Sequence, residues 1–375
     1  MNNNEKSLHR KTIEQIPMYI AGKSIEDVKK EFNLSEVVKL ASNENILGPS
    51  KKAVEAIKGC IDNLHLYPDP EARLLKNKIA EKIGVEPENV IVGSGSDEII
   101  SMINIAFLHR NEEVIMPWPS FIRYLHNAII MEAKTNFVPL AEDFKYDIKA
   151  IIDSVTYKTK FIYITNPNNP TGRIMNKADI EYMIEGCPDE MILIIDEAYK
   201  EFVEDEEYPE TVDLVNKYPN KNVIILRTFS KLYGLAGLRI GYAISRKSII
   251  NMLYRVKSPF NTSTVAQVAA LAALDDIEHV EKTRKLIRDE KVYIYRRLLE
   301  QGINFVPSET NFILINTGVD GKEVFNRLQK DGIIVRDMRM YKLDTYVRIT
   351  IGLREQNKKM LDNMFKIIKQ LGEEK

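Results

Sequence analysis

The chain has 375 residues, more than one hydrophobic core usually fills, so we expect two domains. Its 53 Lys and Arg nearly balance its 54 Asp and Glu, which argues against a nucleic-acid-binding protein. The two cysteines and five histidines lack the spacing of a metal or redox site, and no apolar run approaches membrane-spanning length. We therefore expect a soluble, cytoplasmic protein without a metal site and without contact with a membrane or nucleic acid.

The N-terminal part, residues 1–40, is amphipathic and irregular, apart from a short helix predicted at 24–32. A polar loop around Asn43 follows, and this residue either faces a ligand or serves as a turn residue. Tyr67 then stands on a bend that two prolines make rigid, just before a helix predicted at 71–83. This tyrosine is either presented to a ligand or packed on its own domain.

The first strand is predicted at 89–92 and runs into a glycine-rich turn, Gly93–Glu98, that opens a helix. Such a turn presents free backbone N–H groups and the positive end of the helix dipole, an arrangement that binds phosphate. Glu98 occupies the place of the third glycine in a dinucleotide fingerprint, so an NAD-dependent oxidoreductase is disfavoured.

Four further strands end next to polar or aromatic residues. They are predicted at 113–117, 160–165, 191–195 and 223–226, and the residues that follow them include Phe121, Asn169, Asp196, and Ser230 with Lys231. Since helix-like segments separate the strands, we expect a mainly parallel sheet with helices on both faces. Ligands of such sheets bind at the C-terminal ends of the strands, so all these residues would meet at one edge.

Two charged residues at this edge are expensive to bury. Lys231 lies between the hydroxyls of Thr228 and Ser230, where a lowered pKa would let its neutral amine form an imine with an aldehyde cofactor. The hydroxyls and Arg239 would hold an anion such as phosphate beside it. The alternative is a surface lysine in a glycine-rich loop. Asp196 directly follows five apolar residues and needs a cationic partner.

The C-terminal part predicts a second, smaller α/β domain. Its elements are helices at 246–257 and 264–300, the latter bridging the domains, strands at 311–316, 333–336 and 346–351, and helices at 321–331 and 355–371. Arg336 and Arg348 interrupt apolar strands, either as clamps for a carboxylate or phosphate or as residues of an exposed face. The expected organisation is an N-terminal segment 1–40 that packs on the small domain and a partner, a large domain 41–265 and a small domain 266–375.

Taken together, these motifs resemble those of pyridoxal-phosphate-dependent aminotransferases of the aspartate-aminotransferase-like fold, from about Tyr19 to the C-terminus. Within this fold the chain is most similar to the histidinol-phosphate aminotransferases. The segments that carry this similarity are Leu40–Asn45, Tyr67–Asp69, Arg227–Gly241 and Arg348–Gly352.

The resemblance implies pyridoxal 5′-phosphate as cofactor, with Lys231 as the Schiff-base lysine and general base, and Asp196 paired with the ring nitrogen. Tyr199 and Asn169 would hydrogen-bond the ring hydroxyl, and Phe121 would stack on the ring. The phosphate would be held by the N–H groups of Ser96 and Asp97, by Thr228, Ser230 and Arg239, and by Tyr67 from the other subunit of a homodimer.

For the substrates, the resemblance implies an amino donor and a 2-oxo acid, interconverting L-histidinol phosphate and 2-oxoglutarate with imidazole acetol phosphate and L-glutamate in histidine biosynthesis. Arg348 would bind the substrate carboxylate, and Arg336 with Tyr19 would hold the phosphate of histidinol phosphate. Asn43 and Asn169 would complete the substrate site. Phe121 departs from the tyrosine often found at its position and loses a hydroxyl contact, which bears on substrate identity rather than on reaction type.

Two alternatives remain open from the residues alone. An aromatic amino acid aminotransferase or a threonine-phosphate decarboxylase would keep the fold and the cofactor, because the cofactor labilises whichever Cα bond stands perpendicular to its ring. A non-catalytic ligand-binding module of the same fold is disfavoured by the complete set of Lys231, Asp196 and Arg348.

Overall fold

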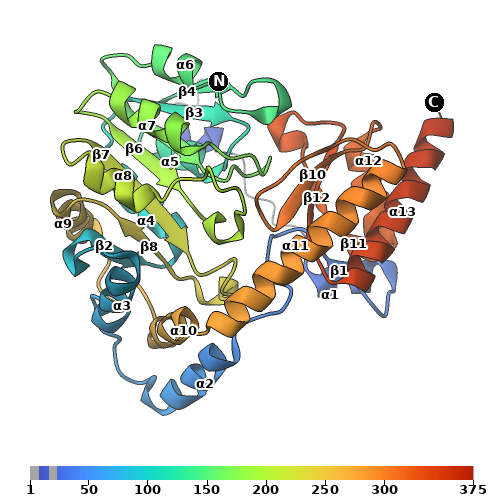
Figure 1. The fold of residues 1–375 in the computed structure, drawn as a ribbon, viewed down its shortest axis with the longest axis horizontal. Helices are drawn as coiled ribbons and strands as arrows, with labels where there is room; N and C mark the ends of the chain where they lie inside the picture. Colours follow the sequence, from blue (N-terminus) through green and yellow to red (C-terminus); the bar gives the residue numbers. More distant parts are fainter. Residues whose placement is uncertain (1–7, 17–22, 375) are drawn as a thin grey trace, which may run out of the picture.

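The computed structural model describes residues 8–16 and 23–374. Its largest sheet has seven strands, and only β8 runs antiparallel to its neighbours (Figure 1). The strand order is β2 (Val90–Gly93), β8 (Gly241–Ile244), β7 (Asn222–Thr228), β6 (Ile192–Asp196), β5 (Thr159–Thr165), β3 (Glu113–Trp118) and β4 (Lys134–Pro139). The five predicted strands are present, and the prediction that they run parallel and end at one edge is confirmed.

Side chains alternate between the two faces of this sheet, as the strand period requires. On one face they pack against three helices, α4 (Gly95–Phe107), α5 (Arg123–Ile130) and α9 (Lys247–Val256). Helices on the other face are α2 (Lys51–Cys60), α3 (Arg73–Ile83), α6 (Ile148–Asp153), α7 (Lys177–Gly186), α8 (Thr211–Lys217) and α10 (Thr264–Leu274). The sheet is therefore buried on both sides and open to ligands only at its edges.

A second hydrophobic core surrounds a four-stranded antiparallel sheet near the C-terminus (Figure 1). The order of its strands is β12 (Arg336–Asp337), β13 (Tyr346–Thr350), β10 (Phe312–Asn316) and β9 (Phe305–Val306). Its helices are α11 (Ile277–Glu300), α12 (Gly321–Lys330) and α13 (Arg354–Glu373). In Figure 1, α11 runs from the neighbourhood of α10 to this second sheet and so bridges the two cores.

Two expectations about this region are wrong in detail. The helical region expected at 264–300 is two helices, because Asp276 ends the connection after α10 and caps α11 by accepting a hydrogen bond from His279 N at 3.3 Å. The strand expected at 333–336 is also divided. Its first half, β11 (Ile333–Ile334), pairs in parallel with β1 (Val38–Lys39), whereas β12 pairs with β13.

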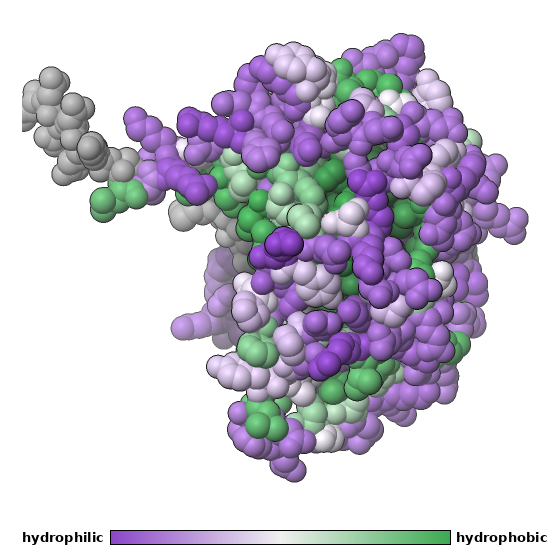
Figure 2. Space-filling model, turned by 90° about the vertical axis from the view of Figure 1, so that its left-hand side faces the viewer, coloured by the Kyte–Doolittle hydropathy of each residue, from purple (hydrophilic) through white to green (hydrophobic). Residues whose placement is uncertain are grey.

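β1 and β11 form a separate two-stranded sheet, which joins the N-terminal part of the described chain, including α1 (Ile25–Phe32), to the C-terminal part (Figure 1). From β1 the chain continues to Leu40, a buried residue of the second core, whose backbone oxygen accepts a hydrogen bond from Thr350 N at 2.8 Å. Among the residues that the structure describes, no helix is long and apolar enough to cross a membrane. The face of the molecule in Figure 2 is mainly hydrophilic, with hydrophobic side chains in small groups.

Candidate active site

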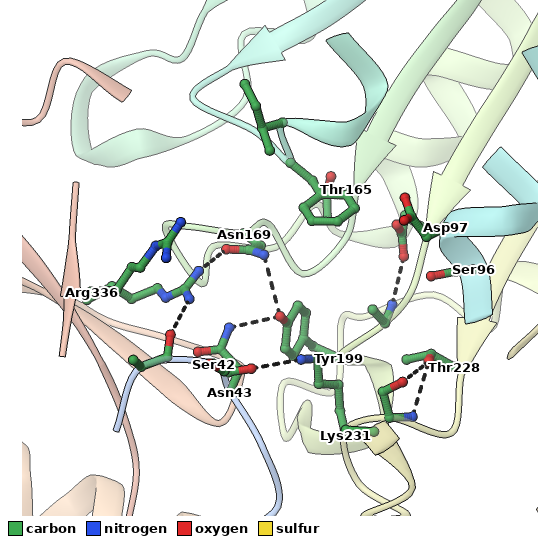
Figure 3. A pocket seen from close by; sticks show the side chains of 18 of the residues that line it. Ser42, Asn43, Ser96, Asp97, Thr165, Asn169, Tyr199, Thr228, Lys231 and Arg336 are labelled. Atoms are coloured by element: carbon green, nitrogen blue, oxygen red, sulfur yellow. Dashed lines mark hydrogen bonds between the residues drawn. The ribbon is translucent and has the colours of Figure 1, made fainter. Parts of the chain in front are cut away.

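A pocket of about 290 Å³ opens where the strand ends of the large sheet face the C-terminal sheet. The sequence predicted most of its wall, as Figure 3 shows. The predicted site residues that line it are Asn43, Ser96, Asp97, Phe121, Asn169, Asp196, Tyr199, Thr228, Ser230, Lys231, Arg239, Arg336 and Arg348. Tyr67 does not line it, and Tyr19 lies outside the described residues.

Lys231 is the amine of this pocket. It follows β7 in a turn and donates from Nζ to the backbone oxygen of Ser42 at 3.1 Å. Burial lowers the pKa of Lys231 to about 8, and the positive charge of Arg348 adds to this effect. A substantial fraction of the amine is therefore neutral near pH 8 and able to attack a carbonyl or accept a proton.

Asp196 is the buried carboxylate of the pocket, at the last position of β6, and only 3% of its surface is exposed. Its two oxygens accept from Tyr124 Oη at 2.8 Å and from Ala198 N at 3.1 Å. Burial raises the pKa of Asp196 to about 6, and none of the described residues forms an ion pair with it. The cationic partner that the sequence predicts for Asp196 is thus not among the side chains of the described residues.

An anion cradle lies at the N-terminal end of α4. Gly95, at φ +78°, leaves room for Arg239, because a Cβ there would meet the guanidinium at 2.8 Å. A Cβ on Gly241 would likewise meet Ser96 N at 2.7 Å, so β8 passes close to the start of the helix. The hydroxyls of Thr228 and Ser230 lie 3.0 Å apart in the same wall. N–H groups, two hydroxyls and a guanidinium together suit a phosphate.

The opposite wall joins the two sheets through a hydrogen-bonded set around Tyr199. Its hydroxyl accepts from Asn43 Nδ2 at 2.9 Å and from Asn169 Nδ2 at 3.5 Å (Figure 3). Arg348 is only 7% exposed, which excludes the exposed-face alternative, and it donates to Asn169 Oδ1 and, at 3.0 Å, to Ala41 O. This wall therefore presents a phenol, two amides and a guanidinium to the pocket.

The remaining predicted residues are less enclosed. Arg336 extends from β12 toward the pocket, with Nη2 3.8 Å from Met340 Sδ (Figure 3). Tyr67 is 82% exposed and stacks on Phe260 with ring centroids 4.6 Å apart. It therefore has no contact with the pocket of its own chain.

Sequence reasoning missed Ser42, Thr165, Met340 and Tyr341 in the wall, and Tyr124 directly behind it. Thr165 is the last residue of the strand that leads to Asn169, and a hydroxyl at the C-terminal end of a parallel strand could have been predicted to face the pocket. Tyr124 reaches Asp196 from 72 positions away, a contact with no local sequence pattern.

Behind the pocket, on the other face of the same strand ends, lies a buried ion pair. Glu197 is fully buried and accepts from Arg227 Nε at 2.8 Å, from Thr211 and, at 3.3 Å, from Tyr208. A second carboxylate, Glu210, accepts from Arg227 Nη2 at 3.1 Å. This network ties β6 to β7 beneath the site.

A family model described as aminotransferase class I and II matches residues 35–364. The chain belongs to this family. This aminotransferase is 41% identical, over 96% of its length, to the histidinol-phosphate aminotransferase of Moorella thermoacetica, of which 92% is covered.

Solved structures agree with the family. A histidinol-phosphate aminotransferase from Sinorhizobium meliloti, crystallised in complex with pyridoxal-5′-phosphate, superposes with a TM-score of 0.89 at 26% identity, covering 97% of this chain and 98% of that one. The aspartate aminotransferase of Thermus thermophilus, as a double mutant, superposes with a TM-score of 0.84 at 23% identity, covering 96% and 99%. The predicted aspartate-aminotransferase-like fold of this aminotransferase is thereby confirmed.

The residues present in this aminotransferase fit pyridoxal phosphate as a cofactor. Its aldehyde requires an amine with a lowered pKa, its phosphate requires an anion cradle, and its basic ring nitrogen requires a buried acid. Lys231, the start of α4 and Asp196 supply these three groups in one pocket.

Proposed function

We propose that this protein is a pyridoxal-phosphate-dependent aminotransferase that interconverts L-histidinol phosphate and 2-oxoglutarate with imidazole acetol phosphate and L-glutamate. The observation that carries the proposal is the placement of Lys231, with its lowered pKa, beside a buried acid and an anion cradle. The names of the curated relatives, histidinol-phosphate aminotransferases, support this substrate. The proposed reaction is a step of histidine biosynthesis.

In this proposal Lys231 holds the cofactor aldehyde and Asp196 its ring nitrogen. Tyr199 and Asn169 hydrogen-bond the ring hydroxyl, and Phe121 packs against the ring. The phosphate is held by the N–H groups of Ser96 and Asp97 and by the side chains of Thr228, Ser230 and Arg239. All of these residues line the same pocket, which supports these roles.

The bound cofactor supplies an electron sink for the charge left when a Cα–H bond breaks. The amine of Lys231 would accept the proton from Cα of the substrate and would later donate it again, and a pKa near 8 suits both transfers. Asp196, as an anion, keeps the ring nitrogen protonated. Tyr199 remains a hydrogen-bond donor throughout, because burial raises the pKa of its phenol to about 12.

For the substrate, Arg348 is proposed to bind the carboxylate of 2-oxoglutarate or glutamate as a bidentate clamp. Its guanidinium lies 5.0 Å from the ring centre of Phe312 and is nearly buried, which favours a fixed orientation. Arg336, together with Tyr19, is proposed to hold the phosphate of histidinol phosphate. Asn43 and Asn169 complete this end of the site.

We also propose a homodimer in which Tyr67 contacts the phosphate in the partner's site. Tyr67 is exposed, and several exposed apolar side chains near it in the chain need a cover: Ile61, Leu64, Leu66 and Leu74. The domain limits 1–40, 41–265 and 266–375 and the cytoplasmic location belong to the same proposal.

Mixing two inactive variants tests the shared site. When Tyr67→Ala and Lys231→Ala subunits exchange, half of the dimers become hybrids with one intact site, so activity returns to about a quarter of wild type. If exchange is demonstrated by mass spectrometry and no activity returns, Tyr67 does not serve the partner's site.

The substrate proposal is tested by 2-oxoglutarate-dependent turnover of histidinol phosphate, histidinol, phenylalanine, tyrosine and threonine phosphate. We expect histidinol phosphate to be the best donor and histidinol to be far poorer. Arg336→Ala should lower kcat/KM for histidinol phosphate and leave kcat/KM for 2-oxoglutarate almost unchanged. Equal turnover of phenylalanine would instead indicate an aromatic amino acid aminotransferase, and release of CO₂ from threonine phosphate a decarboxylase.

A further inference from the structure

Tyr124 on α5 contacts the buried carboxylate from behind the pocket wall. Its ring is fully buried, and its hydroxyl lies 2.8 Å from Asp196 Oδ2 and 3.1 Å from Thr165 Oγ1. Thr165 Oγ1 in turn lies 3.1 Å from Ser120 Oγ. An ionised carboxylate only accepts hydrogen bonds, so Tyr124 donates to Asp196. The hydroxyl of Thr165 then donates to that of Tyr124, and the hydroxyl of Ser120 donates to that of Thr165.

Packing fixes this hydroxyl in place. The ring of Tyr124 stacks on that of Tyr163 with centroids 4.3 Å apart and an angle of 7°, and the edge of Phe121 meets it at 5.5 Å. Tyr163 is itself held by a hydrogen bond from Asn104 Nδ2 at 2.7 Å. Tyr124 can therefore hold one oxygen of Asp196 in a defined direction without reorganisation.

We propose that Tyr124 is a positioning residue for Asp196, which fixes the orientation of the carboxylate and keeps it ionised for the ring nitrogen of the cofactor. This inference rests on the proposed function, because it requires that Asp196 bind that nitrogen. Tyr124 touches neither substrate nor cofactor in this account and acts through Asp196.

The electrostatic surroundings of Asp196 make this hydrogen bond consequential. Burial raises the pKa of the Asp196 carboxyl to about 6, and the hydrogen bond from Tyr124 opposes that rise. Titratable groups that face Asp196 come from several elements: Asp97 of α4, Tyr124 of α5, Tyr146, Tyr163 of β5, Glu197, Tyr199 and Lys231. Asp97 and Glu197 raise its pKa further, so loss of the Tyr124 hydroxyl moves the carboxyl toward its neutral form at pH 7.

The test measures the affinity of the full-length apoprotein for pyridoxal 5′-phosphate by equilibrium titration from pH 5 to pH 9. In wild type, affinity falls as the pH drops through the titration of Asp196. In Tyr124→Phe we expect the pH midpoint to move upward by about one to two units, so that the dissociation constant rises about 2- to 10-fold at pH 7 and about 10- to 100-fold at pH 5.

Tyr163→Phe is the matched control. It removes one hydroxyl from the ring that stacks on Tyr124, in the same buried layer, but that hydroxyl bonds Asn104 rather than Asp196. We expect it to lower the melting temperature about as much as Tyr124→Phe while leaving the pH midpoint in place. In an Asp196→Asn background, Tyr124→Phe should add little to the loss of affinity.

Replacing Tyr124 with 3-fluorotyrosine keeps the shape of the ring and makes the hydroxyl a stronger donor, so the midpoint should move downward even if Tyr124→Phe folds poorly. Unchanged midpoints in both Tyr124 variants would overturn the inference and leave the proposed function intact. If wild type does not bind the cofactor at all, the proposed function and the inference fall together.

Discussion

The end of β6 places two carboxylates next to each other in the chain on opposite faces of the sheet. Glu197 is fully buried and satisfied by Arg227, Thr211 and Tyr208. Asp196 is almost equally buried but, among the described residues, receives only neutral donors, a phenol and a backbone N–H. The free-energy cost of burying an ionised carboxylate is thus offset by an arginine at Glu197, whereas no cation among the described residues offsets it at Asp196.

The difference separates a structural charge from a functional one. The charge of a buried carboxylate with a guanidinium partner is compensated within the fold, and removal of either partner is strongly destabilising. A buried carboxylate without a cation keeps a raised pKa and destabilises the fold until a cationic group arrives. Burial alone does not distinguish the two residues, whereas the set of partners does.

The largest expected effect lies on the Asp196 side, where Lys231→Ala removes the amine that we propose moves the proton. We expect turnover to fall by about 10⁴-fold, because no other lysine of the described chain lines this pocket. Borohydride should attach the cofactor covalently to wild type at residue 231, as detected by peptide mass spectrometry, and should not attach it to the variant. A turnover within tenfold of wild type would contradict the role of Lys231.

On the Glu197 side, Arg227→Met leaves a fully buried carboxylate without its main partner. We expect a loss of about 3–5 kcal/mol in the free energy of unfolding, measured by urea titration, and a kcat/KM at 25 °C within about tenfold of wild type. Lys149→Ala is the control, since the pair that Lys149 forms with Asp153 is exposed and its loss costs less than about 1 kcal/mol. A loss of activity without a loss of stability would show that Arg227 and Glu197 serve the reaction rather than the fold.

Asp196→Asn should have the opposite effect to Arg227→Met: a loss of activity and a gain in stability. We expect turnover to fall about 10²- to 10³-fold, because the ring nitrogen loses its anionic partner. The apoprotein should become more stable at pH 8, by on the order of 3 kcal/mol, since a carboxyl with a pKa of about 6 instead of 3.8 is costly to ionise in the folded state.

The pH dependence of this gain in stability follows from the direction of the Asp196 pKa shift on folding. The folded state binds the proton of Asp196 more tightly than the unfolded state, so the cost of the carboxylate is present above about pH 6 and disappears as the pH falls toward 4. Melting temperatures of the wild-type and Asp196→Asn apoproteins should therefore differ at pH 8 and converge at pH 4. A constant difference would assign the effect to packing.

The smallest of these effects concerns Arg348, a third nearly buried charge that lies across the pocket. Loss of a bidentate carboxylate contact in Arg348→Ala should reduce kcat/KM for 2-oxoglutarate about 10- to 150-fold. Arg348→Lys should be almost as poor, because an ammonium cannot form the fork. If both variants retain wild-type kinetics and lose only stability, Arg348 belongs with Arg227 as a structural residue.

Much of this site could be predicted from the sequence because its residues follow strongly apolar strands. Asp196 and Lys231 were found by the cost of a charge at a strand end, and parallel strands bring such ends to one edge. This logic requires no knowledge of distant contacts. It also places Asn169 and Phe121 correctly in the pocket wall.

What the sequence did not predict depends on pairing between distant segments. The division of 333–337 into β11 and β12 arises because two different strands, β1 and β13, pair with its halves. The antiparallel β8 is short and carries no signal of its direction. Tyr124 looks like an ordinary core aromatic of a helix, and only the fold brings its hydroxyl to Asp196.

The pairing of β1 with β11 has a consequence for synthesis of the chain. Ala41 and Arg348, which are hydrogen-bonded to each other in one wall of the pocket, stand 307 positions apart, so a ribosome working at about 5–20 residues per second makes them about 15–60 s apart. The seven-stranded sheet is complete at Ile244, and Lys231 and Asp196 can be in place well before the substrate end exists. We therefore expect nascent chains to pass through a stage in which the wall with Lys231 and Asp196 has formed and the wall with Arg348 is still missing.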